Sequence, residues 1–307
     1  MIRRLAVALV LAVSQLPVQS VSPFPGSPFP AGHQVIVCGA DELYILDLTG
    51  SAPRKVWSWR AADRPELPEP MRRKFQTIAE CKPADGGARI LVASSSNGAA
   101  VIERATGRVE FYATAPNGHS IELLPGERVV IAASHAGNGT GDRLIVYDLA
   151  RSDVERFHID TPWPHAVIWD APRNMLWADS QKDVVGYRLT DWNSDAPRLT
   201  PEVVAQLPDS NGHDMMVVPD SPQLILATAG HTWLFDRDTH AFQRHPVLGD
   251  LPKVKSVNIH PQSQRLIWVQ GEGTQWWSEV LHLLNPDGAV QLPGEKVYKV
   301  RWMPEAR

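Results

Sequence analysis

Cysteine is scarce in this sequence, because only Cys38 and Cys81 occur among its 307 residues. Small exported domains that depend on disulfides are far richer in cysteine, so the chain is not a disulfide-built scaffold. The two residues could still form one disulfide. Each of them, however, falls in the strand pattern of a different sequence repeat, and this favours two buried free thiols.

An excess of charge of either sign is also missing. The 30 basic and 34 acidic residues give a formal net charge of −4. No global positive field favours nucleic acid, and we therefore expect no nucleic-acid partner.

The short motifs of several enzyme classes are absent as well. The sequence contains no P-loop, no dinucleotide-binding Gly-x-Gly-x-x-Gly after a strand, no His-Glu-x-x-His and no Gly-x-Ser-x-Gly. These absences argue against a P-loop NTPase, a Rossmann dehydrogenase, a zinc peptidase of that type and an α/β-hydrolase.

Long apolar runs are confined to the beginning of the sequence. Arg3 and Arg4 precede an apolar run over residues 5–13, and residues 18–20 resemble a small-residue cleavage site. The run is shorter than the ~20 residues that span a bilayer, which favours a signal peptide over an anchor helix. We predict a signal peptide over residues 1–20, an extended lead-in over residues 21–32 and one domain over residues 33–307. The mature protein is then secreted or periplasmic and not membrane-embedded.

One pattern does recur through most of the chain: a strand-like segment with a proline about six residues after its first residue, as from His119 to Pro125. The repeated first residues are Thr77, His119, His165, His213, Lys255 and Tyr298. Their intervals are 42 to 48 residues. A period of about 40–50 residues that holds several short strands indicates a β-propeller.

Each repeat contains the strands of one propeller blade. A strongly apolar second strand follows the first, for example at residues 90–93, 129–132 and 224–227. Short apolar runs of this kind suit strands that are buried on both faces. A third strand and a more polar outer strand, joined by tight turns, complete the pattern.

The two ends of the repeat region complement each other. Residues 34–38 have the pattern of a second strand and residues 297–302 that of a first strand. Their pairing would close the ring without a free strand edge. We therefore predict an all-β fold, a six-bladed β-propeller of four-stranded antiparallel blades closed by the C-terminal strand, and we expect it to be a monomer.

The repeated residues should converge, because the innermost strand of each blade lines the central channel of a propeller. The candidate catalytic residues are therefore His119, His165, His213, Lys255 and Tyr298. Imidazole titrates near neutral pH, and burial can lower the pKa of a lysine toward neutrality. This set is suited to proton transfer.

Three converging imidazoles can also bind a divalent metal, so His119, His165 and His213 are candidate ligands and a divalent metal is the candidate cofactor. A Gly-His pair before a propeller strand is also typical of WD repeats, in which the histidine supports a buried hydrogen-bond network. The third strands of this chain lack the Trp-Asp ending of that repeat, which weakens the structural alternative.

Loops between second and third strands should reach the same channel mouth. They supply the candidate substrate-binding residues His135, His231, Gln270, Glu272, Trp276 and Trp277. The two tryptophans could form a stacking platform for a sugar ring or simply an apolar plug. A long basic connection over residues 60–76 adds Arg72 and Arg73, which could clamp a carboxylate or form an ordinary solvated charge run.

Several segments resemble a family of exported bacterial β-propellers of unknown function, within the WD40/YVTN-like group. The similar segments are Trp57-Ser58-Trp59, Glu80-Cys81-Lys82-Pro83, residues 116–125, Gly212-His213-Asp214 and residues 233–238. The family label implies no activity. The histidine-rich mouth is more loosely similar to that of propeller-fold polysaccharide lyases, which act on uronic-acid sugars.

These features support a carbohydrate-active protein, in the first place a lyase that performs β-elimination on glycans containing uronic acids. One alternative is a non-catalytic propeller that binds a glycan or a protein. Another is a glycoside hydrolase, for which Glu272 and Asp214 are the candidate carboxylates.

Overall fold

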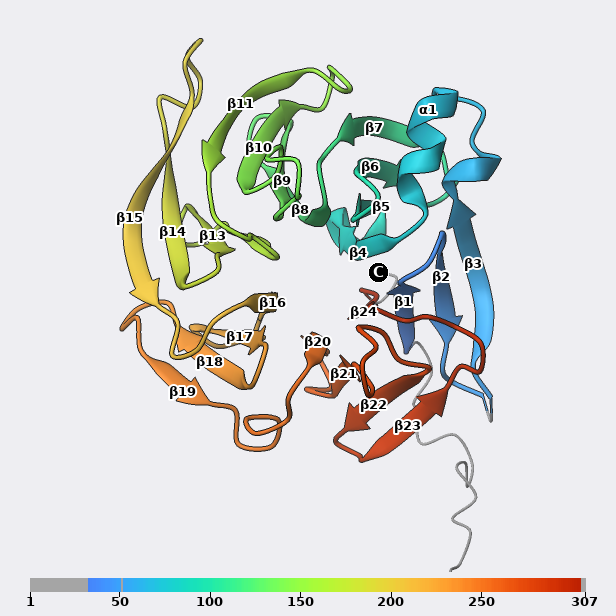
Figure 1. Ribbon diagram of the computed structural model, residues 1–307. Coiled ribbons are helices and arrows are strands. Elements are labelled where there is room, and N and C mark those ends of the chain that lie inside the picture. The colour runs from blue at the N-terminus through green and yellow to red at the C-terminus, as the bar shows by residue number, and fades with distance from the viewer. Residues whose placement is uncertain (1–32, 51, 305–307) are drawn as a thin grey trace, which may run out of the picture.

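The computed structural model describes residues 33–50 and 52–304, which form a ring of six blades around a central axis (Figure 1). Each blade is a four-stranded sheet in which sequential strands pair antiparallel. The prediction of a six-bladed propeller is confirmed. The predicted signal peptide and lead-in lie outside the described residues. No helix within residues 33–50 and 52–304 is long and apolar enough to cross a membrane.

Five blades are continuous in sequence, and the first strand of each is the innermost one. Blade 1 consists of β4 (Ile78–Ala84), β5 (Arg89–Ser94), β6 (Gly98–Glu103) and β7 (Val109–Thr114). Blade 2 consists of β8 (Gly118–Leu124), β9 (Arg128–Ala133), β10 (Arg143–Asp148) and β11 (Glu155–Asp160). Blade 3 consists of β12 (Val167–Asp170), β13 (Met175–Asp179), β14 (Asp183–Thr190) and β15 (Arg198–Gln206).

The next two blades follow the same order. Blade 4 consists of β16 (Gly212–Val217), β17 (Gln223–Thr228), β18 (Thr232–Asp236) and β19 (Phe242–Arg244). Blade 5 consists of β20 (Val254–Ile259), β21 (Leu266–Gln270), β22 (Val280–Leu284) and β23 (Gly288–Gln291).

The closing blade combines both ends of the described chain. It consists of β24 (Lys299–Trp302), β1 (Gln34–Cys38), β2 (Glu42–Asp47) and β3 (Arg54–Arg60). Strand β24 pairs antiparallel with β1, from Val35 opposite Trp302 to Cys38 opposite Lys299. The ring is therefore closed by the strand pairing that the sequence predicts.

A disulfide joins Cys38 of β1 to Cys81 of β4, with their Cα atoms 6.1 Å apart. The interpretation of these residues as free thiols is therefore wrong. Their positions in different blades do not separate them, because β1 of the closing blade packs against β4 of blade 1 and both residues lie in the cluster between these blades. The covalent bond links the closing blade to blade 1, beside the seam where the two chain ends meet.

The core lies between blades rather than in one central cluster. All six residues of β9 are buried, as expected for an apolar strand packed on both faces. The connection from β3 to β4 contributes to one interblade cluster through the short helix α1 (Glu69–Arg72) and two 3-10 turns, at Ala61–Asp63 and Arg73–Phe75. Met71 and Phe75 from this connection are buried against Trp59 and its neighbours. The long loop is thus a packed part of the fold.

Candidate functional site

A β-bulge near the start of several inner strands sets the direction of the residues at one channel mouth. In β8, β16 and β20 the pairing register skips one residue, and these residues are His119, His213 and Lys255. A bulged residue leaves the regular alternation of a strand and can be aimed elsewhere. In β4 the skipped residue is Ala79. The assignment of Thr77 to this position is wrong by two residues, because β4 contains its proline instead of ending before it.

A cavity of about 270 Å³ lies at this mouth. Its lining residues are Thr77, Ala79, Ser95, His119, His165, His213, Lys255, Trp276 and Tyr298. The structure thus brings together all five candidate catalytic residues and one of the candidate substrate-binding residues.

The imidazole of His165 contacts those of both His119 and His213. The ring centroid of His165 lies 4.2 Å from that of His119 and 5.5 Å from that of His213. Tyr298 meets His119 edge-on with 6.1 Å between ring centroids, and Trp276 meets Tyr298 at 5.3 Å. The aromatic rings therefore form one continuous wall of the cavity.

The hydrogen bonds of His165 fix the role of each ring nitrogen. Its Nδ1 lies 3.1 Å from the carbonyl oxygen of Trp163, so a neutral ring donates there. The other nitrogen, Nε2, then keeps its lone pair as an acceptor. The backbone is held as well, because Oδ1 of the buried Asp179 accepts hydrogen bonds from the amides of His165 and Ala166 at 2.7 and 2.6 Å. Asp179 thus positions the histidine.

Lys255 forms a close pair with His213, with 2.9 Å between Nζ and Nε2. When the ammonium donates this bond, His213 Nε2 is the acceptor and the imidazole proton resides on Nδ1. That Nδ1 atom is buried and has no hydrogen-bond partner in the structure. Nδ1 of His119 is also buried without a hydrogen-bond partner, whereas its Nε2 lies 3.2 Å from Asn117 Oδ1.

Burial favours the neutral form of each titratable side chain in the cavity, so it lowers the pKa of the histidines and the lysine and raises that of the tyrosine. It lowers the pKa of His165 to about 4 and the pKa values of His119 and His213 well below their usual range, with the nearby cations adding to the effect. Burial, helped by Lys253, lowers the pKa of Lys255 to about 8. Burial and the carboxylates of Asp214 and Glu80 raise the pKa of Tyr298. At neutral pH the cavity therefore contains neutral imidazoles, a protonated phenol and a mostly protonated amine.

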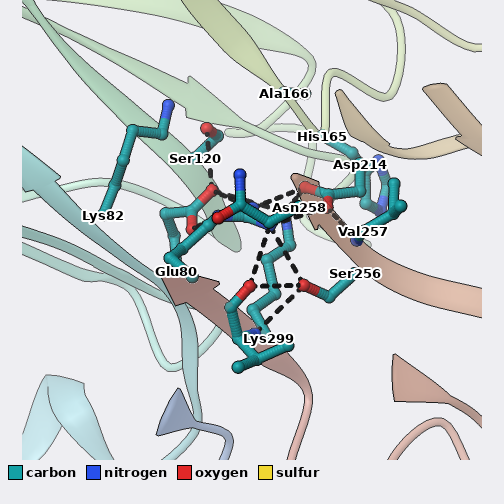
Figure 2. A network of polar contacts seen from close by, with 12 residues as sticks. Glu80, Lys82, Ser120, His165, Ala166, Asp214, Ser256, Val257, Asn258 and Lys299 are labelled. Atoms are coloured by element: carbon teal, nitrogen blue, oxygen red, sulfur yellow. Dashed lines mark hydrogen bonds and ion pairs between the residues drawn. The ribbon is translucent and has the colours of Figure 1, made fainter. Parts of the chain in front are cut away.

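A network of buried charges lies on the inner strands, next to residues that line the cavity (Figure 2). The Arg301 guanidinium donates to Glu80 Oε2 at 3.0 Å and to Asp214 Oδ1 at 2.6 Å. Lys299 donates to the same Asp214 oxygen at 2.9 Å, and Ser256 Oγ accepts from Arg301 at 3.0 Å. All four charged side chains are at most 1% exposed. We call this group, Glu80, Asp214, Lys299 and Arg301, the channel plug.

The plug keeps its carboxylates ionised. Burial alone would raise the pKa of Glu80 and of Asp214, but Arg301 and Lys299 hold both values below their usual range. Sequence reasoning did not identify Glu80, Lys299 or Arg301 as a group. The sequence did contain a pattern that could have identified them. Glu80, Asp214 and Lys299 each directly follow a residue that lines the cavity, namely Ala79, His213 and Tyr298.

Most of the other candidate substrate-binding residues lie outside the cavity lining. Arg73 pairs with Glu69 at the surface and Arg72 is half-buried in the packed connection from β3 to β4. His231 Nδ1 lies 2.7 Å from Asp209, and Gln270 donates to the carbonyl of Pro252 at 2.9 Å.

The remaining candidates, Glu272, Trp277 and His135, do not line the cavity either. Glu272 accepts a hydrogen bond from Ser278 at 2.6 Å, and Lys296 lies 5.7 Å above the Trp277 ring. His135 lines a separate groove of about 440 Å³ with Trp163. Neither Glu272 nor the buried Asp214 lines the small cavity, so the carboxylate pair suggested for a hydrolase does not meet there.

The histidines do not have the arrangement of a metal centre. Among residues 33–50 and 52–304, no group of three or more His, Cys, Asp or Glu side chains is placed to hold a metal ion. His213 Nε2 already accepts from Lys255, so this imidazole would have to lose that bond before it could bind a metal through Nε2. The residues thus fit a divalent cofactor poorly, and we assign no chemical step to one.

The chain belongs to a family described as being of unknown function, DUF6528, whose model matches residues 40–306. No curated protein matches the sequence. Among solved structures, a chain in the crystal structure of a nidogen/laminin complex is similar, with a TM-score of 0.61 and 11% identity over 89% of this chain and 98% of that chain. At this identity the likeness shows a shared fold alone.

Proposed function

We propose that the cavity binds a uronic-acid residue of a glycan and catalyses β-elimination across it. The observation that carries this proposal is the pairing of Lys255 with His213 in a small cavity whose other polar groups include a neutral imidazole with a free lone pair and a protonated phenol. Elimination needs three groups: a cation that binds the carboxylate, a base that removes the proton from the adjacent carbon and an acid that protonates the departing oxygen.

Lys255 is suited to be the cation that binds the carboxylate. Among the described residues that line the cavity it is the one basic ammonium or guanidinium group, and its pKa of about 8 leaves it mostly protonated at neutral pH. Its charge would hold the substrate carboxylate and stabilise the negative charge that develops there when the adjacent proton leaves. This replaces the role that the sequence suggested for Arg72 and Arg73.

His165 is suited to be the base. Its Nδ1–H is committed to the Trp163 carbonyl, so Nε2 is left as the acceptor. In the proposed step, Nε2 takes the proton from the carbon next to the carboxylate. The electrons of that C–H bond form the new carbon–carbon double bond, and the bond to the glycosidic oxygen breaks.

Tyr298 is suited to be the acid. Burial and the neighbouring plug carboxylates raise its pKa, so it retains a proton to donate to the departing oxygen. Transfer of the proton from His165 back to Tyr298 then restores both side chains, and no further reactant is consumed. The cavity of about 270 Å³ is smaller than the ~300–1,000 Å³ of typical small-molecule sites, which suits a single sugar ring.

An exported location fits the same proposal. The Cys38–Cys81 disulfide supports it, because structural disulfides persist in oxidising compartments. It agrees with the signal peptide that the sequence predicts.

The experiment is an ultraviolet assay for the unsaturated product with oligomers of galacturonic and glucuronic acid. We expect product with the wild type and at least a hundredfold lower rate with Lys255→Met. Lys55→Met, which removes an exposed lysine of the outer strand β3, is the matched control and should retain most activity. Equal rates for the two variants would contradict the role of Lys255. Binding without product by the wild type would favour a non-catalytic glycan-binding propeller.

A further inference from the structure

Two exposed tryptophans mark the surface around the cavity. Within residues 33–50 and 52–304, Trp163 and Trp276 are the two aromatic side chains of the Phe, Tyr and Trp types that are more than a third exposed, at 37% and 41%. Exposing an indole to water is unfavourable, since burying a large apolar side chain contributes about 1.5–3 kcal/mol. Both exposed indoles are near the same channel mouth.

Each tryptophan is linked to a different residue of the cavity. The carbonyl of Trp163 binds His165 Nδ1, and Trp276 lines the cavity and meets Tyr298 edge-on. His165 precedes β12 of blade 3, and Tyr298 precedes β24 of the closing blade. Blade 3 and the closing blade lie opposite each other in the ring (Figure 1). Trp276 itself lies in the loop between β21 and β22 of blade 5, so the two indoles approach the cavity from different blades.

Polar groups accompany the Trp163 ring. His135 stacks on it with 4.9 Å between ring centroids and 9° between planes, and His135 in turn pairs with Asp142 at 2.8 Å. The groove beside them, of about 440 Å³, also includes Gln181 and Arg143. One face of the indole is thus supported from within the protein, which holds it in place, while hydrogen-bonding groups surround it.

Positive charge accompanies the Trp276 ring. Lys296 lies over the ring of the adjacent Trp277, and Lys253 donates to the carbonyl of Gly273 in the same loop. A sugar ring has one or two apolar C–H faces and a rim of hydroxyls, so it stacks on an indole and bonds to polar neighbours. The lysines favour sugars that carry carboxylates.

We infer that this mouth binds a chain of acidic sugars, with one ring in the cavity and flanking rings stacked on Trp163 and on Trp276. The ring in the cavity rests on the proposed function, whereas the two flanking platforms rest on the exposed indoles themselves. The cavity is too small for more than a small part of such a chain. The rest of the ligand must therefore lie across the surface where these platforms are.

Isothermal calorimetry in a Tyr298→Phe background, which lacks the proposed acid and so leaves the ligand uncleaved, tests this inference with galacturonic and glucuronic acid as single sugars and as hexasaccharides. Trp163→Ala and Trp276→Ala should each weaken hexasaccharide binding about tenfold, the factor that corresponds to about 1.4 kcal/mol of lost stacking. Binding of the single sugars should change less than twofold with Trp163→Ala. Trp163→Phe should keep most of the affinity, and Val204→Ala, at an exposed site of β15, is a control for surface truncation.

The outcomes separate this inference from the proposed function. Unchanged hexasaccharide affinity in both tryptophan variants overturns the platforms, even where the wild type forms the elimination product. Weaker hexasaccharide binding in these variants supports the platforms, even where no elimination is detected. Failure of every hexasaccharide to bind the folded wild type overturns the inference as well.

Discussion

At the scale of the residue, the proposed chemistry depends on two protonation states. Lys255 must carry its proton to hold a carboxylate, and His165 must lack one to act as a base. Burial lowers both pKa values, to about 8 for the lysine and about 4 for the histidine. A lowered histidine pKa keeps the base form down to acidic pH, and a lowered lysine pKa limits the charged form at alkaline pH.

We therefore expect a bell-shaped dependence of kcat/KM on pH, with an acidic limb near 4 and a basic limb near 8. Activity should rise as His165 loses its proton and fall as Lys255 loses its own. Lys255→Arg keeps the charge at higher pH, so in a variant that retains activity the basic limb should move upward. A basic limb that stays near 8 in that variant would show that another group is responsible.

The sequence predicted the five titratable residues of the cavity because one residue per period recurs ahead of each inner strand. It placed Thr77 where Ala79 belongs, since β4 contains Pro83 whereas β8 ends before Pro125, so a fixed count back from the proline goes too far. It also missed the plug residues Lys299 and Arg301, because a charge in a strand ordinarily indicates a solvent-exposed side. Only the closed ring brings these charges together.

At the scale of the element, the seam between β24 and β1 is the point where the ring can open. The Cys38–Cys81 bond lies next to it and joins β1 to β4. The sequence predicted the strand pairing but not the bond, because positions in different blades appear remote until the inner strands are placed around one axis.

Removal of the disulfide should weaken this seam. The bonded residues are 43 positions apart in the sequence, and a loop of this length corresponds to about 4 kcal/mol of denatured-state entropy in the simplest model. We expect the Cys38→Ala, Cys81→Ala variant to lose about 2–4 kcal/mol of unfolding free energy in urea titrations. Reduction of the wild type with dithiothreitol should give a similar loss, and an unchanged midpoint in both would contradict this role.

At the scale of the whole molecule, the channel plug joins three inner strands, because Glu80 lies in β4, Asp214 in β16 and Lys299 and Arg301 in β24. A hydrogen bond from Arg301 to Ser256 connects it to a fourth, β20. Its ion pairs are fully buried, so each charge depends on the others for compensation. The plug therefore ties together blades that are not neighbours in sequence, and Glu80, Asp214 and Lys299 directly follow residues that line the cavity.

Arg301→Met should cost about 3–5 kcal/mol of unfolding free energy, because it leaves Glu80 and Asp214 with Lys299 as their main remaining cation. Arg54→Met is the matched control. Arg54 pairs with Asp47 at the surface, with 74% of its side chain exposed, and its loss should change stability by less than about 1 kcal/mol. Equal effects of the two substitutions in denaturant unfolding would contradict the importance of the plug.

The central claim is that the histidine- and lysine-lined cavity performs an elimination. The most direct measurement is mass spectrometry of the products from galacturonate and glucuronate hexasaccharides incubated with the protein in water enriched in ¹⁸O. Elimination divides the chain without adding water, so the summed product masses equal the substrate mass, no ¹⁸O is incorporated at the cleaved bond and one fragment is unsaturated. Products that gain the mass of a water molecule and carry ¹⁸O would show hydrolysis, and intact hexasaccharides alone would show no cleavage. Either result would contradict the claim.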